Sequence, residues 1–201
     1  SKLEIVLYFY FLGIVFIYLG EIFYSFLINK NENKSHSFRY SFLPIFGIFI
    51  TSNFLVIWNF FSGTADNFIL FLFLILFLVS LRSNPSLIKN YIFYFINLTI
   101  LFLSSTTVGI SKDANLYHLQ QQSWLRDEKI VLGISNINPY LGYSSIIEYI
   151  NSILWFENNY IFIHFIGIYI IASIFDLFFK FLKSNNSSYK NFAFLFLTIG
   201  I

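Results

Sequence analysis

One long polar segment, residues 111–159, holds most of the side chains that could carry out chemistry. Its carboxylate best suited to act as a general base is Asp113, which could take a proton from an acceptor hydroxyl. Basic and hydrogen-bonding groups follow closely in the sequence, and such groups can hold a phosphate or position a sugar. They are Tyr117 and His118 for the sugar or phosphate, and Arg126 and Lys129 for the phosphate. These residue types fit the transfer of a sugar from a lipid-linked phosphate.

The same side chains also have ordinary structural interpretations. Asp113 is placed to cap the N-terminus of a helix. The run from Arg126 to Lys129 is typical of a solvated charge cluster at the end of such a helix, and Trp124 is typical of an anchor at a membrane interface. The residues alone leave both interpretations open.

The composition indicates an integral membrane protein. Of the 201 residues, 57% are hydrophobic and only 11% are charged, whereas about 25% are charged in soluble domains. A net charge of +2 gives no reason to expect a nucleic-acid partner. The absence of Cys excludes disulfides and thiolate metal sites. No cofactor is predicted, and a divalent metal ion is left open.

Apolar runs predict an all-α, polytopic transmembrane helical bundle. Residues 1–110 are expected to form four spans, residues 111–159 one long loop, and residues 160–201 a fifth span and the start of a sixth. The predicted spans are 3–28, 42–61, 68–81, 91–110 and 160–182, of which 68–81 is short, and the last run starts near Asn191. The chain has no Met, so we expect a single membrane domain from a longer protein.

The distribution of basic residues predicts which side of the membrane each loop occupies. Lys and Arg concentrate in cytoplasmic loops. One alternating set of loops holds eight of the twelve basic residues: Lys30, Lys34, Arg39, Arg82, Lys89, Lys180, Lys183 and Lys190. The N-terminus and the 111–159 loop are therefore expected to lie outside.

The outer loop is expected to contain two short interfacial helices. The first would follow Asp113 and pass through Trp124. The spacing of Ser145 and Glu148 is that of a capping box, which predicts a second helix over about residues 146–156. Within the fifth span, Asp176 and Lys180 are four residues apart, so we expect them to pair on one helix face.

A further pattern runs through the outer loop: Asp113, Leu-Tyr117-His118-Leu-Gln, Trp124, Ile130-Val-Leu-Gly133-Ile-Ser-Asn136 and Gly142-Tyr-Ser-Ser145. This pattern resembles a motif of poorly characterised bacterial polytopic membrane proteins, a group similar to the GT-C superfamily of membrane glycosyltransferases. The resemblance implies a GT-C-like fold in a bacterial inner membrane, with Asp113 as the catalytic residue and Asn136 among the substrate-binding residues. It also implies transfer from a polyprenyl-phosphate-linked sugar to a cell-envelope glycan or lipid on the outer face.

Three other functions remain open from the sequence. A transporter or flippase for lipid-linked sugars would show broken spans and charged residues at mid-membrane, whereas these spans are mostly uninterrupted. A polysaccharide polymerase would need several Arg residues in its outer loops, and only Arg126 is present there. A non-enzymatic membrane component is the third alternative.

Overall fold

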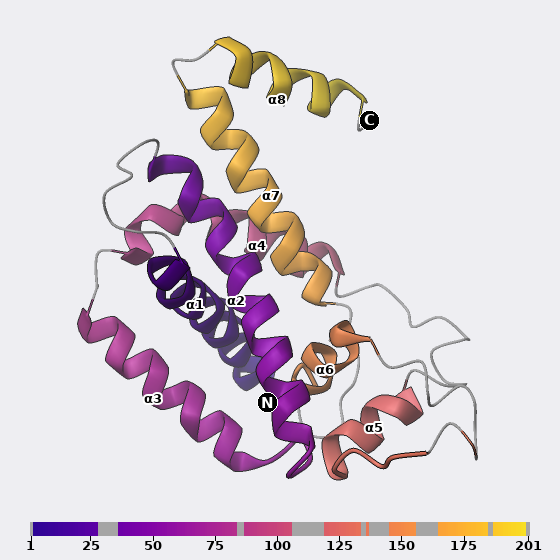
Figure 1. Cartoon of the computed structure of the whole chain (residues 1–201). Coiled ribbons are helices and arrows are strands. Elements are labelled where there is room, and N and C mark those ends of the chain that lie inside the picture. Colours follow the sequence, from indigo (N-terminus) through magenta and orange to yellow (C-terminus); the bar gives the residue numbers. More distant parts are fainter. Residues whose placement is uncertain are drawn as a thin grey trace.

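The computed structural model describes residues 2–27, 36–83, 87–105, 119–133, 136, 145–155, 165–184 and 187–199. These residues form helices joined by turns, without a strand among them (Figure 1). The elements are α1 (Lys2–Leu27), α2 (His36–Asn59), α3 (Asn67–Ser83), η1 (Leu87–Tyr91), α4 (Ile92–Ser105), α5 (Leu119–Asp127), α6 (Ile146–Ile153), α7 (Phe165–Lys183) and α8 (Ser187–Ile199). The prediction of an all-α chain is therefore confirmed for the described residues.

Four helical stretches are long and apolar enough to cross a membrane. They are Leu3–Leu27, Tyr40–Asn59, Leu87–Ser105 and Phe165–Lys183. The apolar part of α3, Asn67–Val79, is shorter, as the sequence predicted for that run. Large apolar side chains on these helices are exposed, including Phe26 at 86%. Because water-soluble proteins rarely expose so much apolar surface, these features together indicate an integral membrane protein.

Two helix starts differ from the prediction by hydropathy. The second span was expected to begin at residue 42, but α2 begins at His36 and contains Pro44 in its interior. Transmembrane helices tolerate an internal proline when neighbouring groups satisfy the freed backbone. The fourth span begins with the 3-10 turn η1 before α4. Asp66 directly precedes α3, and its carboxylate accepts a hydrogen bond of 2.9 Å from the backbone N–H of Phe68, so it caps the helix.

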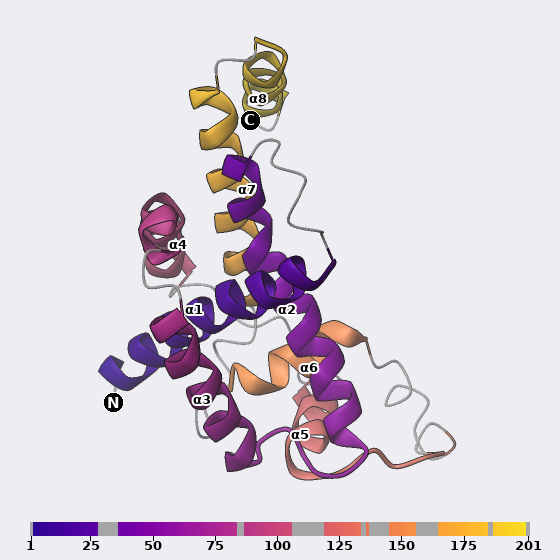
Figure 2. The same ribbon diagram turned by 60° about the vertical axis from the view of Figure 1, so that its left-hand side comes forward.

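Helices α1 and α2 approach each other closely at two glycines. A Cβ atom on Gly20 would lie 1.9 Å from the Leu43 carbonyl oxygen, and one on Gly47 would lie 1.8 Å from that of Phe16. The two contacts run in opposite chain directions, so the helices are antiparallel. Figure 2 shows α1 crossing α2 where these contacts occur. Small residues at such crossings allow the backbones of membrane helices to approach.

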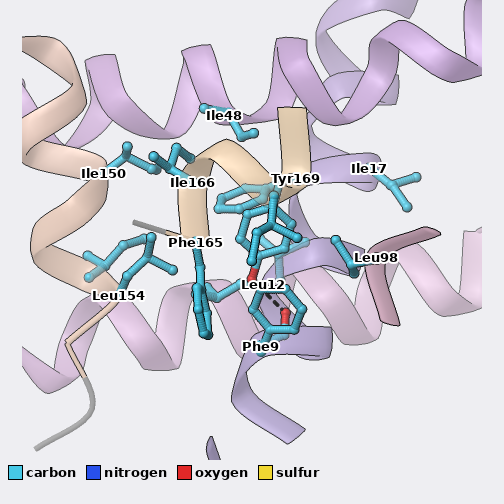
Figure 3. Packing of buried hydrophobic residues seen from close by; sticks show 14 of the residues in the cluster. Phe9, Leu12, Ile17, Ile48, Leu98, Ile150, Leu154, Phe165, Ile166 and Tyr169 are labelled. Atoms are coloured by element: carbon cyan, nitrogen blue, oxygen red, sulfur yellow. Dashed lines mark hydrogen bonds between the residues drawn. The ribbon is translucent and has the colours of Figure 1, made fainter. Parts of the chain in front are cut away.

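An aromatic core joins α1, α4 and α7 (Figure 3). The ring of Phe9 packs against Phe165 and Tyr169, with ring centroids 5.4 and 4.7 Å apart. The Tyr169 hydroxyl donates a hydrogen bond of 2.8 Å to the Phe9 carbonyl oxygen, drawn as a dashed line in Figure 3. Ile150 and Leu154 belong to the same cluster, which ties α6 to the long helices.

The short helices α5 and α6 lie together at one end of the molecule, beside the turn that connects α2 to α3 (Figure 1). Helix α6 packs against α2, and α5 packs against α6. Helix α8 follows α7 at the opposite end (Figure 1). The two short helices thus lie beside the end of α2 that leads into α3 (Figure 1).

Candidate functional site

Three of the predicted site residues, Asp113, Tyr117 and His118, lie outside the described residues. The remaining three are Arg126, Lys129 and Asn136, and the structure separates them. Arg126 lines a pocket beneath α5, while Lys129 and Asn136 are exposed. The candidate site therefore has to be built around Arg126.

The end of α5 that carries Arg126 is held by a fully buried asparagine. The Asn59 side-chain amide donates hydrogen bonds of 3.1 and 2.8 Å to the carbonyl oxygens of Leu125 and Glu128. Backbone N–H groups of Thr64 and Ala65 donate to the carbonyl oxygens of Leu125 and Arg126 at 2.8 and 3.0 Å. These bonds satisfy the last carbonyl groups of a helix that would otherwise lack partners, and they fix the start of the Arg126 side chain.

Gly63 allows this contact. A Cβ atom at Gly63 would lie 2.1 Å from the Arg126 carbonyl oxygen, so a larger residue would push α5 away from the α2–α3 turn. The turn and the polar loop therefore meet through backbone atoms, which positions Arg126 by the fold of two segments distant in the sequence.

The Arg126 guanidinium faces the C-terminal end of α6. Its Nη1 atom donates hydrogen bonds of 2.9 Å to the Ser152 carbonyl oxygen and 3.4 Å to that of Trp155. The guanidinium carbon also lies 5.0 Å from the centroid of the Trp155 ring, within the range of a cation–π contact. From α1, the Tyr8 hydroxyl donates to the Ile153 carbonyl oxygen at 2.7 Å.

A buried glutamine fixes the orientation of Trp155. Gln122 is 1% exposed. Its Nε2 atom donates to Glu148 Oε2 at 2.7 Å, and its Oε1 atom accepts a hydrogen bond of 2.6 Å from Trp155 Nε1. The indole therefore presents its ring to Arg126 in one orientation, because both ends of the glutamine amide are engaged.

The pocket has a volume of about 290 Å³, which lies at the lower end of the range for small-molecule sites. Its lining includes Tyr8 of α1 and Leu70 of α3, and the residues next to these in the sequence, Leu7 and Phe71, are exposed apolar side chains. We call it the Arg126 pocket, and its lining residues are Tyr8, Thr64, Ala65, Asn67, Leu70, Arg126, Ile153 and Trp155. Its lining combines one cation, one indole and several hydrogen-bonding groups with apolar side chains.

Arg126 stays positively charged although it is partly buried. Partial burial lowers the pKa of its guanidinium, whereas the nearby Asp127 carboxylate and Tyr8 hydroxyl act to raise it. An arginine remains protonated in proteins, so the pocket wall carries a positive charge. A partly desolvated cation of this kind attracts a phosphate more strongly than an exposed one does.

Removing the Gln122 amide should loosen Trp155. We expect Gln122→Ala to cost about 1–3 kcal/mol, because the change removes two hydrogen bonds from a buried site, and to increase quenching of Trp155 fluorescence by acrylamide. The measurement uses a background with the other two tryptophans, Trp58 and Trp124, changed to Phe. The matched control is Gln120→Ala, an exposed position on the same helix; equal quenching in the two variants would contradict this role for Gln122.

The structure places Lys129 and Asn136 apart from the Arg126 pocket and corrects the predicted role of Ser145. Lys129 forms no hydrogen bond or ion pair with any described residue and does not line the Arg126 pocket. The backbone N–H of Asn136 donates to the carbonyl oxygen of Gly133, closing a turn in which Gly133 has a φ of 84°. Ser145 does precede α6, but its side chain makes no capping hydrogen bond, so the expected capping box is wrong in that half.

Sequence reasoning missed four groups of the pocket: Tyr8, Thr64, Asn67 and the Trp155 ring facing Arg126. Tyr8 lies within an apolar span, and nothing in the local pattern separates it from the other aromatic residues there. Thr64 and Asn67 belong to a short polar turn that the charge distribution places on the same side as the outer loop. Their predicted location on the same side of the membrane as the outer loop was the sequence feature that could have linked them to Arg126.

Metal ligands do not gather in this region. Within the described ranges, no group of three or more His, Cys, Asp or Glu side chains is arranged to hold a metal ion. The pocket lining itself contains no carboxylate. The described part of the site is therefore suited to binding, and a general base would have to come from elsewhere in the chain.

Comparisons with protein-family models, with curated proteins and with solved structures found no match to this chain.

Proposed function

We propose that the chain belongs to a membrane glycosyltransferase of the GT-C type. In this proposal the enzyme moves a sugar from a polyprenyl-phosphate donor to a cell-envelope glycan or lipid on the outer face of the membrane. The observation that carries it is the Arg126 pocket, where a partly buried cation lines a cavity together with residues of two apolar helices, α1 and α3.

The pocket suits the head of a lipid-linked sugar. Arg126 would attract the phosphate, and the Asn67 side chain would add a hydrogen bond. The lipid chain would lie along α1 and α3, whose apolar side chains are exposed. An aromatic ring such as Trp155 offers a flat apolar face to the sugar.

The transfer step needs one base and one cation. The acceptor oxygen attacks the anomeric carbon of the sugar while its proton passes to Asp113, and the bond from that carbon to the lipid-phosphate oxygen breaks. The phosphate leaves with the bonding electrons, and Arg126 stabilises the charge that develops on it. A positioned base contributes roughly 10²- to 10⁴-fold in rate, so Asp113 is the residue whose change tests catalysis.

We expect Asp113→Asn to abolish transfer while the protein remains in the membrane. The measurement compares lipid-linked and surface glycans by mass spectrometry in the wild type, a deletion strain and a strain that carries Asp113→Asn, with protein level checked in each. A glycan defect equal to that of the deletion, at normal protein level, supports the proposal. Wild-type glycans in the variant, alongside a defect in the deletion, would remove Asp113 from catalysis.

A transporter or flippase for lipid-linked sugars is the second candidate. It is favoured by the buried Asp176, which pairs with the partly exposed Lys180 in α7, because ionisable groups inside a membrane-crossing helix often mark a transport path. A polysaccharide polymerase and a non-enzymatic membrane component have no specific observation in their favour. The Asp113→Asn comparison separates the two candidates, since a transporter has no need of that base.

A further inference from the structure

A second polar cluster lies inside the helices, away from the Arg126 pocket. It is centred on Asp176 of α7, which is 1% exposed. The Asp176 Oδ2 atom accepts hydrogen bonds from the Ser41 hydroxyl of α2 and from the ammonium of Lys180, one turn further along α7. The predicted pairing of Asp176 with Lys180 is therefore confirmed.

The ammonium of Lys180 lies in a box of aromatic rings and oxygen atoms. Its Nζ atom is 5.9 Å from the ring centroid of Tyr40 and 5.6 Å from that of Tyr91. It also donates a hydrogen bond of 3.1 Å to the Ser41 hydroxyl. Aromatic faces combined with a carboxylate are the groups by which proteins bind ammonium ligands, so Lys180 acts here as an internal ligand.

Lys180 leaves some hydrogen-bonding atoms of this box without a partner. The Asp176 Oδ1 atom and the hydroxyl oxygen of Tyr91 are buried and have no hydrogen-bond partner among the described residues. Tyr91 and Tyr94 are fully buried, and both lie within electrostatic range of the Asp176 carboxylate. Buried polar atoms without partners are costly, and here they are acceptors beside a site that already holds an ammonium group.

Lys180 lies at the exposed edge of this cluster. The Lys180 side chain is 16% exposed while that of Asp176 is 1% exposed, and Lys180 belongs to the last turn of α7. A lysine stem of this length can turn its ammonium to a nearby membrane surface. The carboxylate, the tyrosines and the serine would then remain as an open cation site.

We propose that this cluster, formed by Tyr40, Ser41, Tyr91, Tyr94 and Asp176, is a binding site for a primary ammonium group, which exchanges with Lys180. A primary ammonium has three N–H donors and a positive charge that matches the Asp176 carboxylate, and the Glu21 carboxylate of α1 also lies within electrostatic range of Tyr91. The group can come from the headgroup of an ethanolamine lipid or from a dissolved amine. The proposal is independent of the function proposed for the Arg126 pocket.

Chemical rescue tests the site. We expect Lys180→Ala to lower the unfolding temperature of the whole protein in choline-lipid nanodiscs. Propylamine supplies the three carbons and the ammonium that alanine lacks, so it should raise that temperature by about 2–4 °C or more at saturating concentration. Neutral propanol should have no such effect. Lys180→Gln serves as a second variant in case the alanine variant does not fold.

Two comparisons decide the result. Propylamine should not stabilise Lys180→Ala when Asp176→Asn is also present, and it should not stabilise Lys183→Ala, which removes a neighbouring lysine outside the box. An equal effect of propylamine in all three variants, or no effect in the first, overturns the site.

The wild-type protein then tests exchange and identifies the source. A higher unfolding temperature in ethanolamine-lipid nanodiscs than in choline-lipid nanodiscs indicates a lipid headgroup, and a rise with dissolved ethanolamine alone indicates a free amine. Either rise should disappear in Asp176→Asn. The absence of both rises in the wild type, with rescue intact in Lys180→Ala, overturns exchange because Lys180 is then a permanent occupant.

Discussion

Replacing Gly47 with alanine should separate α1 from α2 and destabilise the whole helical assembly. The added Cβ would lie 1.8 Å from the Phe16 carbonyl oxygen, and neither backbone can move alone, because Gly20 makes the corresponding contact with Leu43 one turn away. Overpacking typically costs about 1–3 kcal/mol and occasionally more. We expect a loss at or above the upper value, since the overlap is between two backbones.

Gly167 provides the matched control for this change. It lies in α7, and a Cβ atom there meets nothing within 4 Å. Gly167→Ala should leave stability unchanged or raise it by up to about 1 kcal/mol, because alanine favours the helix. Thermal unfolding of both variants in one detergent measures the difference. Equal stabilities would show that the α1–α2 contact is not as close as described.

Changing Arg126 to glutamine should remove most of the affinity for a lipid phosphate. A hydrogen bond to a charged group contributes about 1.5–3 kcal/mol, so polyprenyl phosphate should bind roughly 10- to 150-fold more weakly in nanodiscs. Arg126→Lys keeps the charge but loses the planar guanidinium, and its affinity should fall between those of the wild type and Arg126→Gln.

Two features of the structure determine the controls for the binding measurement on Arg126→Gln. Lys129→Gln removes an equal charge from an exposed side chain nearby, and its affinity should stay close to that of the wild type. Arg126 also holds carbonyl oxygens at the end of α6, so binding must be measured well below the unfolding temperature of each variant. Unchanged affinity in Arg126→Gln would assign the guanidinium to the support of α6 alone.

Most of the long helices could be predicted from the sequence because an apolar run of that length has few other stable structures in a membrane. The helix starts were less predictable. Hydropathy placed the second start at residue 42, after a polar stretch that nevertheless continues α2 back to His36. The pairing of Asp176 with Lys180 was predictable because a spacing of four fixes it locally.

The pocket itself was predictable only in part. Arg126 was singled out as a cation in a polar loop, but its neighbours come from α1, the α2–α3 turn and α6. Contacts between segments so far apart in the sequence leave no local pattern. Glu148 illustrates this difference, since its spacing from Ser145 suggested a helix cap while its carboxylate accepts a hydrogen bond from Gln122.

We propose that the Arg126 pocket binds the phosphate of a membrane-embedded lipid. A photoreactive polyprenyl phosphate, incorporated into nanodiscs with the purified protein, tests it most directly. We predict labelling of peptides that contain Leu70 and Trp155, with loss of the label on adding unlabelled polyprenyl phosphate and in Arg126→Gln. Labelling spread over lipid-exposed positions such as Phe26 and Phe194, with no competition and no change in Arg126→Gln, would contradict it.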